Sequence, residues 1–318
     1  MTAIYRNNLP QSQGGQFLTD SGLETTLIFE NGLDLPCFAS YPLLDSVSGR
    51  QTLRAYFERH LSIAADKGIG FVLEAPTWRA SRDWGVQVGH SSGDLERLNK
   101  AAITLLADIR STAEAISPIV ISGNIGPRGD GYRPDTAMGA EEAEAYHAEQ
   151  IKWFAATAAD MVSAFTLSTV NEGVGVIRAA SAAGIPSVVS YTTETDGRLP
   201  DGTALGEAIE QTDMATAGAA AYFMVNCAHP DHFRAALETE AAWLKRIWGV
   251  RANASRLSHA ELDEAEELDP GNPAELGRDY ARLKQILPDL RVYGGCCGTD
   301  HRHVEAIADC CVHRPGLH

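Results

Sequence analysis

The stretch QTLRAYFERHLSIAADKGIGFVLEA, residues 51–75, contains the unit from which we predict the whole fold. Gln51 to Asp66 has helical periodicity and is followed by Gly68, the residue type that most often ends a helix. Ile69 to Ala75 is a short apolar run of the length expected for a buried strand. A helix that leads directly into a buried strand is typical of α/β proteins with a parallel sheet.

The same alternation recurs along the chain. Further segments with helix signals run from Glu141 to Ala159 and from Glu172 to Ala183, and the second is followed by Gly184. Candidate strands begin near eight positions: Phe17, Ile69, Ile119, Met161, Ser187, Tyr222, Ile247 and Arg291. Eight strands followed by helices in 318 residues fit a closed (β/α)8 TIM barrel, which takes ~250 residues plus insertions, better than an open sheet with a cap.

We expect a single domain that spans residues 1–318. No repeat, low-complexity tract or Pro/Ser-rich linker divides the chain. The acidic stretch from Glu261 to Asp269, followed by Pro-Gly-Asn-Pro, is compatible with a domain boundary. We interpret it instead as a solvated loop between two elements of the barrel.

Composition narrows the class of protein. The chain has 42 Asp and Glu residues against 26 Lys and Arg, which gives a formal net charge of -16. A field of that sign repels phosphate backbones and anionic lipids, so neither nucleic acid nor membrane is an expected partner. No stretch approaches the ~20 apolar residues of a membrane span, and residues 1–17 lack the pattern of a secretory signal. We therefore expect a cytoplasmic protein whose six cysteines are free thiols or metal ligands.

The segment Val292-Tyr-Gly-Gly-Cys-Cys-Gly-Thr299 is the most informative motif for function. Two adjacent cysteines follow a predicted strand and are enclosed by glycines. Neighbouring side chains of a regular strand point to opposite faces, whereas glycines let the backbone turn and bring both sulfurs toward one point. A disulfide between the two neighbours is a strained alternative that a reducing compartment disfavours.

A third cysteine, Cys227, ends another apolar run, Tyr222-Phe-Met-Val-Asn-Cys227. The C-terminal ends of barrel strands all face one mouth, so Cys227, Cys296 and Cys297 can converge although they are far apart in the sequence. Three thiolates suit Zn2+, and three protein ligands with an open fourth position are typical of a catalytic zinc site. For Cys227 taken alone, a buried apolar thiol is the alternative.

Two other groups of residues offer alternatives to a site of three cysteines. Cys310 and Cys311 form a second adjacent pair, but they lie in a predicted terminal helix, His303 to Val312, without glycines to orient them. We interpret them as packing residues. A mixed Cys/His zinc site is also conceivable, because four histidines closely follow the cysteine motifs: His229, His232, His301 and His303.

In order and spacing these motifs resemble those of the homocysteine S-methyltransferase family, which includes betaine-homocysteine methyltransferase and the S-methylmethionine-dependent enzymes. The resemblance covers most of the chain. The further motifs that carry it are Asp20-Ser-Gly-Leu-Glu-Thr25, Ser122-Gly-Asn-Ile-Gly-Pro-Arg-Gly129, Ser190-Tyr-Thr-Thr-Glu-Thr-Asp-Gly-Arg-Leu-Pro-Asp-Gly-Thr203 and Asn253-Ala-Ser255. The resemblance implies a zinc-bearing barrel in which Cys227, Cys296 and Cys297 hold the metal and the thiol of homocysteine takes the open position.

The activity that the resemblance implies is transfer of a methyl group from a small sulfonium or ammonium donor to homocysteine, which gives methionine. We expect S-methylmethionine as the donor, ahead of S-adenosylmethionine and betaine, because the chain has no nucleotide fingerprint and no room for cobalamin or folate modules. Zinc suits this chemistry, since a thiol with a pKa of ~8.5 is mostly protonated at neutral pH and coordination ionises it.

We expect the substrates to contact six residues: Asp20, Glu24, Phe38, Trp78, Asn226 and Gly295. Phe38 and Trp78 offer aromatic faces to a cationic donor, with hydrophobic packing of a loop as the alternative. Arg79 is an unfavourable neighbour for a cation, and binding the carboxylate of the donor or acceptor is the role that suits it.

The chain departs from the family at the end of its fourth strand. Where the family has a Glu-Thr pair that anchors the amino group of homocysteine, this chain reads Phe165-Thr166-Leu167-Ser168. Asp20 is our first candidate for the missing carboxylate, and the others are Glu24, Glu74 and Glu172. The departure keeps two alternatives open, a zinc hydrolase or lyase and a zinc- or thiol-binding barrel of diverged function. Three thiolates make zinc a poor Lewis acid, so we rank methyl transfer first. The expected partners are a small thiol and a methyl donor, and a homo-oligomer is compatible with this interpretation.

Overall fold

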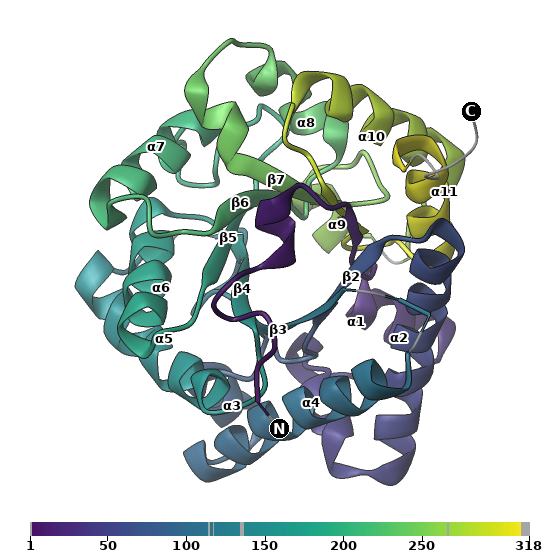
Figure 1. Cartoon of the computed structure of the whole chain (residues 1–318). Coiled ribbons are helices and arrows are strands. Elements are labelled where there is room, and N and C mark those ends of the chain that lie inside the picture. The colour runs from purple at the N-terminus through teal and green to yellow at the C-terminus, as the bar shows by residue number, and fades with distance from the viewer. Residues whose placement is uncertain (1, 114, 117, 134–136, 266, 313–318) are drawn as a thin grey trace.

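Eight parallel strands close into a barrel in which each strand pairs with its neighbours in sequence and β1 pairs with β8 (Figure 1). The structure, a computed structural model, describes residues 2–113, 115–116, 118–133, 137–265 and 267–312. The strands are β1 Phe17–Leu18, β2 Gly70–Glu74, β3 Ile119–Ile125, β4 Met161–Leu167, β5 Ser187–Tyr191, β6 Tyr222–Asn226, β7 Ile247–Ala252 and β8 Val292–Gly295. Each begins within one residue of its predicted start, and the predicted (β/α)8 barrel is confirmed.

Helices surround the barrel and lie between successive strands (Figure 1). They are α1 Leu23–Thr25, α2 Val47–Lys67, α3 Arg82–Val88, α4 Ser92–Thr112, α5 Ala140–Ala155, α6 Val170–Ala183, α7 Leu205–Thr216, α8 Pro230–Phe233, α9 His259–Asp263, α10 Pro273–Ile286 and α11 His301–Cys311. The connection from β6 to β7 is the least regular, because the four-residue α8 is followed there by two 3-10 turns, Arg234–Leu237 and Ala242–Arg246. Among the described helices, none combines the length and apolar character needed to cross a bilayer.

The two predicted glycine stop signals agree with the structure, whereas α5 ends at Ala155, four residues before its predicted end at Ala159. The helix α2 begins after Ser46, whose hydroxyl accepts a hydrogen bond from the Gly49 N–H, and it ends at Gly68 with a φ of +66°. Similarly, α6 ends at Gly184 with a φ of +67°. Glycine adopts the left-handed backbone conformation without steric cost, so these two glycines end the helices just before the next strand begins.

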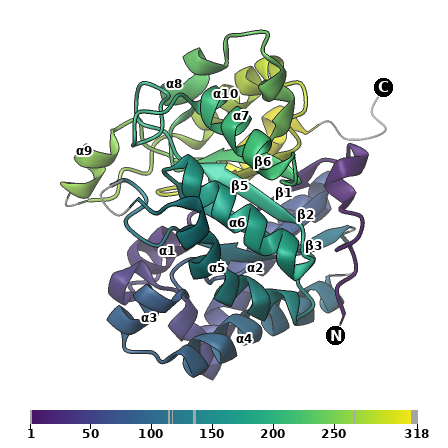
Figure 2. The ribbon, with the colours of Figure 1, turned by 90° about the vertical axis from the view of Figure 1, so that its left-hand side faces the viewer.

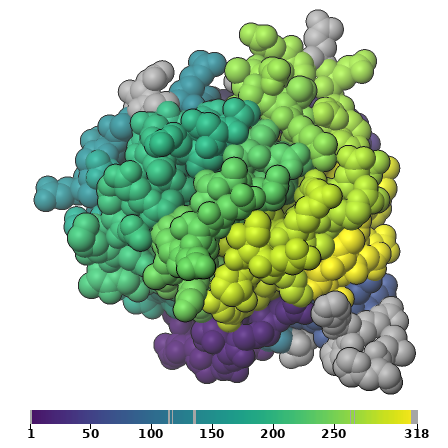
Figure 3. Space-filling model, turned by 90° about the horizontal axis from the view of Figure 1, so that it is seen from above, coloured from purple at the N-terminus to yellow at the C-terminus, as the bar shows by residue number. Residues whose placement is uncertain are grey.

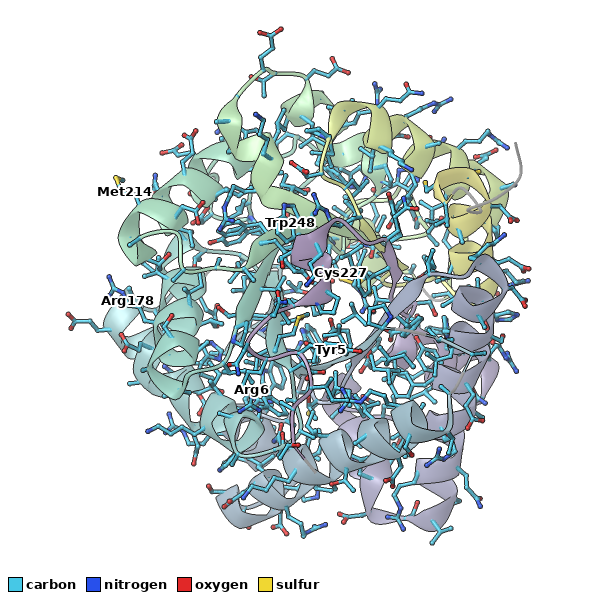
Figure 4. The ribbon with its side chains drawn as sticks, viewed as in Figure 1. Tyr5, Arg6, Arg178, Met214, Cys227 and Trp248 are labelled. Carbon is cyan, nitrogen blue, oxygen red and sulfur yellow. A yellow bond between two sulfur atoms is a disulfide. The ribbon has the colours of Figure 1, made fainter. Side chains whose placement is uncertain are left out.

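The lower half of the barrel interior is apolar and closed. Alternate strand residues point inward, and those of this half belong to one cluster: Phe17, Val72, Val120, Met161, Val188, Tyr222, Met224 and Val292. Phe165, of the same cluster, extends to the lining of the cavity at the other end. The N-terminal segment crosses this end of the barrel, and Asp160 Oδ1 accepts the backbone N–H groups of Ile4 and Tyr5 at 2.7 and 2.8 Å (Figures 1 and 4). Trp248 stacks on Tyr222 with ring centroids 5.0 Å apart. The interior is thus a packed core with one closed end.

The opposite end is open and polar. Following the same alternation, the last inward positions of several strands carry polar side chains, among them Glu74, Asn124, Asn226 and Arg251. A view from the side shows α9 projecting from this end, away from the N-terminus (Figure 2). On the face seen in the space-filling view, residues of the second half of the chain, coloured green to yellow, form one continuous surface (Figure 3). Any site for small molecules therefore lies at the C-terminal ends of the strands, as in other barrels of this type.

Candidate metal centre

Three cysteine sulfurs converge at the open end of the barrel. Cys227 directly follows β6 and lies inside the ring of strands (Figure 4), and Cys296 and Cys297 follow β8. All three Sγ atoms lie within 4.8 Å of one another, and those of Cys227 and Cys297 are 3.9 Å apart. Sulfur ligands of one tetrahedral zinc ion, each about 2.3 Å from the metal, lie about 3.8 Å apart. The donor atoms, and the spacing of the Cys227 and Cys297 sulfurs, therefore suit a zinc ion.

The sulfurs of Cys227 and Cys296 are joined as a disulfide, with their Cα atoms 5.5 Å apart. This differs from our expectation of free or metal-bound thiols. The physical reason is the convergence itself, because sulfurs that are aimed at one point are also close enough to bond to each other. Cys297 keeps a free thiol. The centre can thus exist as three thiols or as one disulfide and one thiol.

Unusual backbone angles aim these side chains. Cys227 has a φ of +54°, and Thr166 near the end of β4 has a φ of +64°, in a region that residues other than glycine rarely adopt. Asn253 Nδ2 donates to the Cys227 carbonyl at 3.1 Å and so holds the turn. Strained backbone of this kind persists where the surroundings fix a functional side chain.

The glycines around the cysteine pair act as the sequence predicts. Gly298 has a φ of +75° and turns the chain after Cys297. An added Cβ at Gly295 would overlap the Thr299 side chain, whose hydroxyl donates to the Cys296 carbonyl at 2.6 Å. The cysteine turn is therefore packed too closely to admit side chains at these positions.

Asn226 organises the residues beneath the sulfurs. Its Oδ1 accepts hydrogen bonds from the Thr166 N–H at 2.9 Å and from the Ser190 hydroxyl at 2.7 Å. Its Nδ2 donates to the Thr166 hydroxyl at 2.9 Å and faces Cys296 Sγ at 3.9 Å. Thr166 itself directs its hydroxyl toward Cys227 Sγ at 3.8 Å. The position where a carboxylate was missing from the sequence therefore carries a hydroxyl that contacts a sulfur.

Asp20, our first candidate for the amino-group anchor, is already engaged. Its Oδ1 forms an ion pair with Arg251 Nη1 at 2.7 Å, and its Oδ2 accepts a hydrogen bond from the Tyr56 hydroxyl at 3.1 Å. Both partners of the ion pair are buried, with 2% of Asp20 and 7% of Arg251 exposed. Sequence reasoning missed Arg251, although a charged residue inside an apolar strand was the signal that pointed to it.

Glu74 has an unused carboxylate oxygen. Its Oε1 accepts a hydrogen bond from the Ser163 hydroxyl at 3.1 Å, whereas its Oε2 is buried without a partner among the described residues. Burial raises the pKa of Glu74 to about 7. Glu24 also accepts one hydrogen bond, from Ser40 at 2.7 Å, but it has no buried oxygen left without a partner. Glu172 is paired with His147 at 2.9 Å and lies outside the cavity lining. Glu74 is therefore the carboxylate best able to accept a cationic group.

A cavity of about 550 Å³ opens above the three sulfurs. Its lining includes all three cysteines and five of the six expected contact residues: Asp20, Glu24, Phe38, Trp78 and Asn226. Gly295 does not line it; its N–H donates to the Asp20 carbonyl at 2.9 Å, and its carbonyl accepts from Arg251 Nε at 3.1 Å. Gly295 therefore shapes the cysteine turn and has no free backbone group for a substrate.

The two aromatic side chains expected to contact the donor, Phe38 and Trp78, differ in how accessible their ring faces are. Phe38 is 37% exposed at the mouth, on a turn where both Cys37 and Phe38 have positive φ. Trp78 is covered on one face by Arg79, whose guanidinium carbon is 3.8 Å from a ring centroid. A guanidinium repels a cationic donor, so that face of Trp78 is closed to it.

Loops from opposite sides of the barrel meet over the sulfurs. Tyr132, which follows β3, stacks on His259 of α9 with ring centroids 4.0 Å apart. Tyr132 lines the cavity together with Cys297, and burial raises the pKa of the Cys297 thiol to about 11. The acidic stretch from Glu261 to Asp269, which we expected to be a solvated loop, begins inside α9 and contributes Glu267, Leu268 and Asp269 to the cavity lining.

The alternative of a mixed Cys/His centre finds no support among the described residues. The group of potential ligands around the sulfurs consists of the three cysteines, whereas His229 lies in a separate group with Asp231 and Asp279. His232 and His303 bond to the carbonyls of Arg256 and Pro270. Cys310 and Cys311 lie on α11, apart from the cavity lining. Cys311 is buried in the core, as the packing interpretation predicts, whereas Cys310 is exposed, so the interpretation is wrong for that residue.

Comparisons with known proteins agree with this architecture. The profile of the homocysteine S-methyltransferase family matches residues 17–311. The homocysteine methyltransferase MmuM from Escherichia coli is similar in its oxidized form, with a TM-score of 0.73, 19% identity, and coverage of 95% of this chain and 97% of that one. The metallated form of the same enzyme has a TM-score of 0.71 and 19% identity, with coverage of 95% of this chain and 98% of that one. The apo form has a TM-score of 0.63 and 18% identity, with coverage of 95% and 97%. At this identity the solved structures support the fold alone, and no curated protein matches by sequence.

The family assignment rests on the profile, which spans nearly the whole chain from β1 to the end of α11. The same span contains the barrel, the three converging cysteines and the cavity above them. The chain belongs to the homocysteine S-methyltransferase family.

Proposed function

We propose that the chain is a zinc-dependent S-methyltransferase that transfers a methyl group from a sulfonium donor, with S-methylmethionine as the first choice, to homocysteine. In their reduced form Cys227, Cys296 and Cys297 hold the zinc ion. The observation that carries the proposal is the convergence of three sulfurs at the base of a cavity large enough for two small amino acids. When bound, zinc supplies a means of ionising the acceptor thiol at neutral pH, and the thiolate ligands keep electron density on its sulfur.

Glu74 is proposed to bind the ammonium group of the acceptor. Thr166 offers a hydroxyl where the resemblance implies a glutamate, and Asp20 is neutralised by Arg251. The unpartnered Oε2 of Glu74 is buried in the lining of the same cavity. A bound ammonium would stabilise the ionised form of this carboxylate, whose pKa is raised by burial to about 7.

The charge of the cavity favours a cationic donor. Its described lining includes six carboxylate side chains and only two guanidinium groups, those of Arg79 and Arg251. Glu24, Glu267 and Asp269 lie among the carboxylates on the mouth side, with the exposed ring of Phe38 in the same lining. Opposite charge and an aromatic face are the features that attract sulfonium and quaternary ammonium groups.

The transfer itself is a problem of orientation. The acceptor thiol gives up its proton, its sulfur forms a bond to the methyl carbon, and the carbon–sulfur bond of the donor breaks with its electron pair left on the donor sulfur. Holding both reactants in line replaces an encounter in solution. With S-methylmethionine the spent donor is methionine, so each homocysteine consumed yields two methionines.

The test is a methyl-transfer assay on reduced, zinc-supplemented protein with homocysteine and each of the three donors in turn. We expect two methionines per homocysteine with S-methylmethionine and loss of the activity in Cys297→Ser. Cys310→Ser is the matched control, because Cys310 is an exposed cysteine outside the cavity.

The assay also separates the two alternative functions. Methionine formed with S-adenosylmethionine or betaine, and not with S-methylmethionine, would retain methyl transfer and change the donor. No methionine with any donor would favour the hydrolase or lyase, or the diverged thiol-binding barrel.

A further inference from the structure

Trp78, Arg79 and Trp84 form an arginine clamp in the wall of the cavity. The Arg79 guanidinium carbon lies 3.8 Å from a ring centroid of Trp78 and 3.6 Å from one of Trp84. Each indole is fixed by its own N–H, which donates to the Phe165 carbonyl at 3.3 Å or to the Pro127 carbonyl at 3.2 Å. The planar guanidinium is thus held between two rigid rings, as suits a group that has to recognise another planar group.

The clamp holds a buried charge that forms no ion pair with a described residue. Only 8% of Arg79 is exposed, and its one hydrogen bond runs from Nη1 to the Gly129 carbonyl at 3.2 Å. Its Nε is buried without a partner among the described residues, and the charges of Asp130 and Glu24 act on the guanidinium without forming an ion pair with it. Burial lowers the pKa of Arg79 only to about 10, so the group stays cationic at neutral pH. Buried charges in proteins are normally paired, so this arrangement calls for an anion.

The clamp belongs to the same cavity as the three sulfurs. Trp78, Arg79 and Trp84 line it together with the cysteines. Tyr132, which follows β3, lines the same cavity as Arg79 and Cys297. A molecule bound near the sulfurs can therefore extend to the clamp.

We propose that Arg79 binds the α-carboxylate of an amino-acid reactant, in a bidentate pairing that the two indoles orient. This inference rests on the proposed function for the identity of the reactants and names the group by which they are recognised. A carboxylate is planar and offers two oxygens at the spacing of two guanidinium N–H groups. The reactant is the acceptor, the donor, or each in turn, and the carboxylate is the feature they share.

The experiment measures binding without methyl transfer. Methionine carries the carboxylate but no thiol, and methylthiopropylamine is the same molecule without the carboxylate. Calorimetric titration of the wild type should give about 10- to 150-fold weaker binding of the amine, which is the value of a charge-assisted hydrogen-bond pair. Equal affinities for the two ligands would overturn the proposal.

Variants assign the effect to Arg79. Arg79→Gln should bind methionine as weakly as the wild type binds the amine, and Arg79→Met, which keeps an unbranched chain between the indoles, serves if the first variant does not fold. Arg291→Gln is the matched control, because Arg291 lies over Trp248 at 4.5 Å near the closed end of the barrel. Unchanged methionine affinity in a folded Arg79 variant would overturn the assignment.

Steady-state kinetics then distinguish the two sources of the carboxylate. In Arg79→Gln, a raised KM for homocysteine alone assigns the clamp to the acceptor, and a raised KM for S-methylmethionine alone assigns it to the donor. Failure of the proposed function is a separate result. Suppose that no donor yields methionine, but the wild type binds methionine more tightly than the amine and the Arg79 variant does not. This result would support carboxylate binding by Arg79 and contradict the proposed methyl transfer.

Discussion

The two adjacent cysteine pairs of this chain have the same sequence and opposite surroundings. Cys296-Cys297 follows β8 in a turn packed against Thr299, and both sulfurs face Cys227 and the cavity. Cys310-Cys311 lies on α11, where one thiol is exposed and the other is buried against the core. A helix places consecutive side chains about 100° apart, so the second pair cannot share one ion. The backbone around a cysteine pair, more than the pair itself, therefore decides its chemistry.

The largest expected difference between the pairs is in metal content. We expect about one zinc per chain in the reduced wild type and most of it lost in Cys297→Ser, because removing one of three sulfur ligands leaves too few donors. Cys310→Ser should keep the wild-type content. The measurement is elemental analysis after reduction and zinc loading, and equal zinc in Cys297→Ser and the wild type would refute the ligand assignment.

The difference between the pairs could be predicted from the sequence because it depends on local residues. Glycines on both sides of Cys296-Cys297 signal a sharp turn after a strand, and their absence around Cys310-Cys311 signals a helix. The barrel was predictable for the same reason, since stop signals such as Gly68 and the apolar strands are short-range features. The convergence of Cys227 with the pair then followed from the topology.

Contacts between distant strands could not be predicted in this way. The ion pair between Asp20 and Arg251 joins β1 to β7, and the sequence does not show which inward positions face each other across a barrel. The same holds for Trp84, which reaches back from α3 to cover Arg79. Our preference for Asp20 as the amino-group anchor failed to consider this pairing, and Glu74 has the free oxygen instead.

Glycines beside each pair provide a second comparison. Gly295→Ala forces Thr299 and the cysteine turn to shift, so we expect zinc affinity to fall about 10- to 100-fold, as when contacts that orient a ligand are lost. Gly277→Ala places a Cβ 2.6 Å from the Ala306 carbonyl and 3.1 Å from Cys310 Sγ. It should lower the free energy of unfolding by about 1–3 kcal/mol and leave zinc affinity unchanged. Competition with a chromogenic chelator and urea unfolding measure the two effects; the comparison fails if both variants lose zinc equally.

Within the second pair, the two cysteines should differ in stability. Cys311 is fully buried in the main core, so Cys311→Ala is expected to cost about 1 kcal/mol of unfolding free energy. Cys310 is exposed, and Cys310→Ala should stay within about 0.5 kcal/mol of the wild type. Urea unfolding of reduced, metal-free protein measures both values. A larger loss at Cys310 than at Cys311 would contradict the packing role given to Cys311.

The smallest expected effect concerns Asp300, which follows the first pair and starts the helix that carries the second. Burial alone would raise its pKa, but hydrogen bonds from His303 and Arg302 hold the pKa of Asp300 well below its usual range. A lowered pKa in the folded state means that the carboxylate contributes stability above about pH 4 and that this contribution is lost as the pH falls further. Asp300→Asn can still cap the helix, so we expect a loss of about 1 kcal/mol or less at pH 7.

The same substitution should flatten the acid side of the stability profile. Urea midpoints of the metal-free protein between pH 7 and pH 3 should fall less steeply in Asp300→Asn than in the wild type, because one group that binds a proton on unfolding is gone. Zinc affinity at pH 7 should be unchanged, since Asp300 bonds to the first turn of α11 and not to the sulfurs. If the urea midpoints of the two proteins fell equally with pH, the Asp300 carboxylate would not titrate in this range. If Asp300→Asn lost zinc affinity, the start of α11 and the cysteine turn would act as one unit.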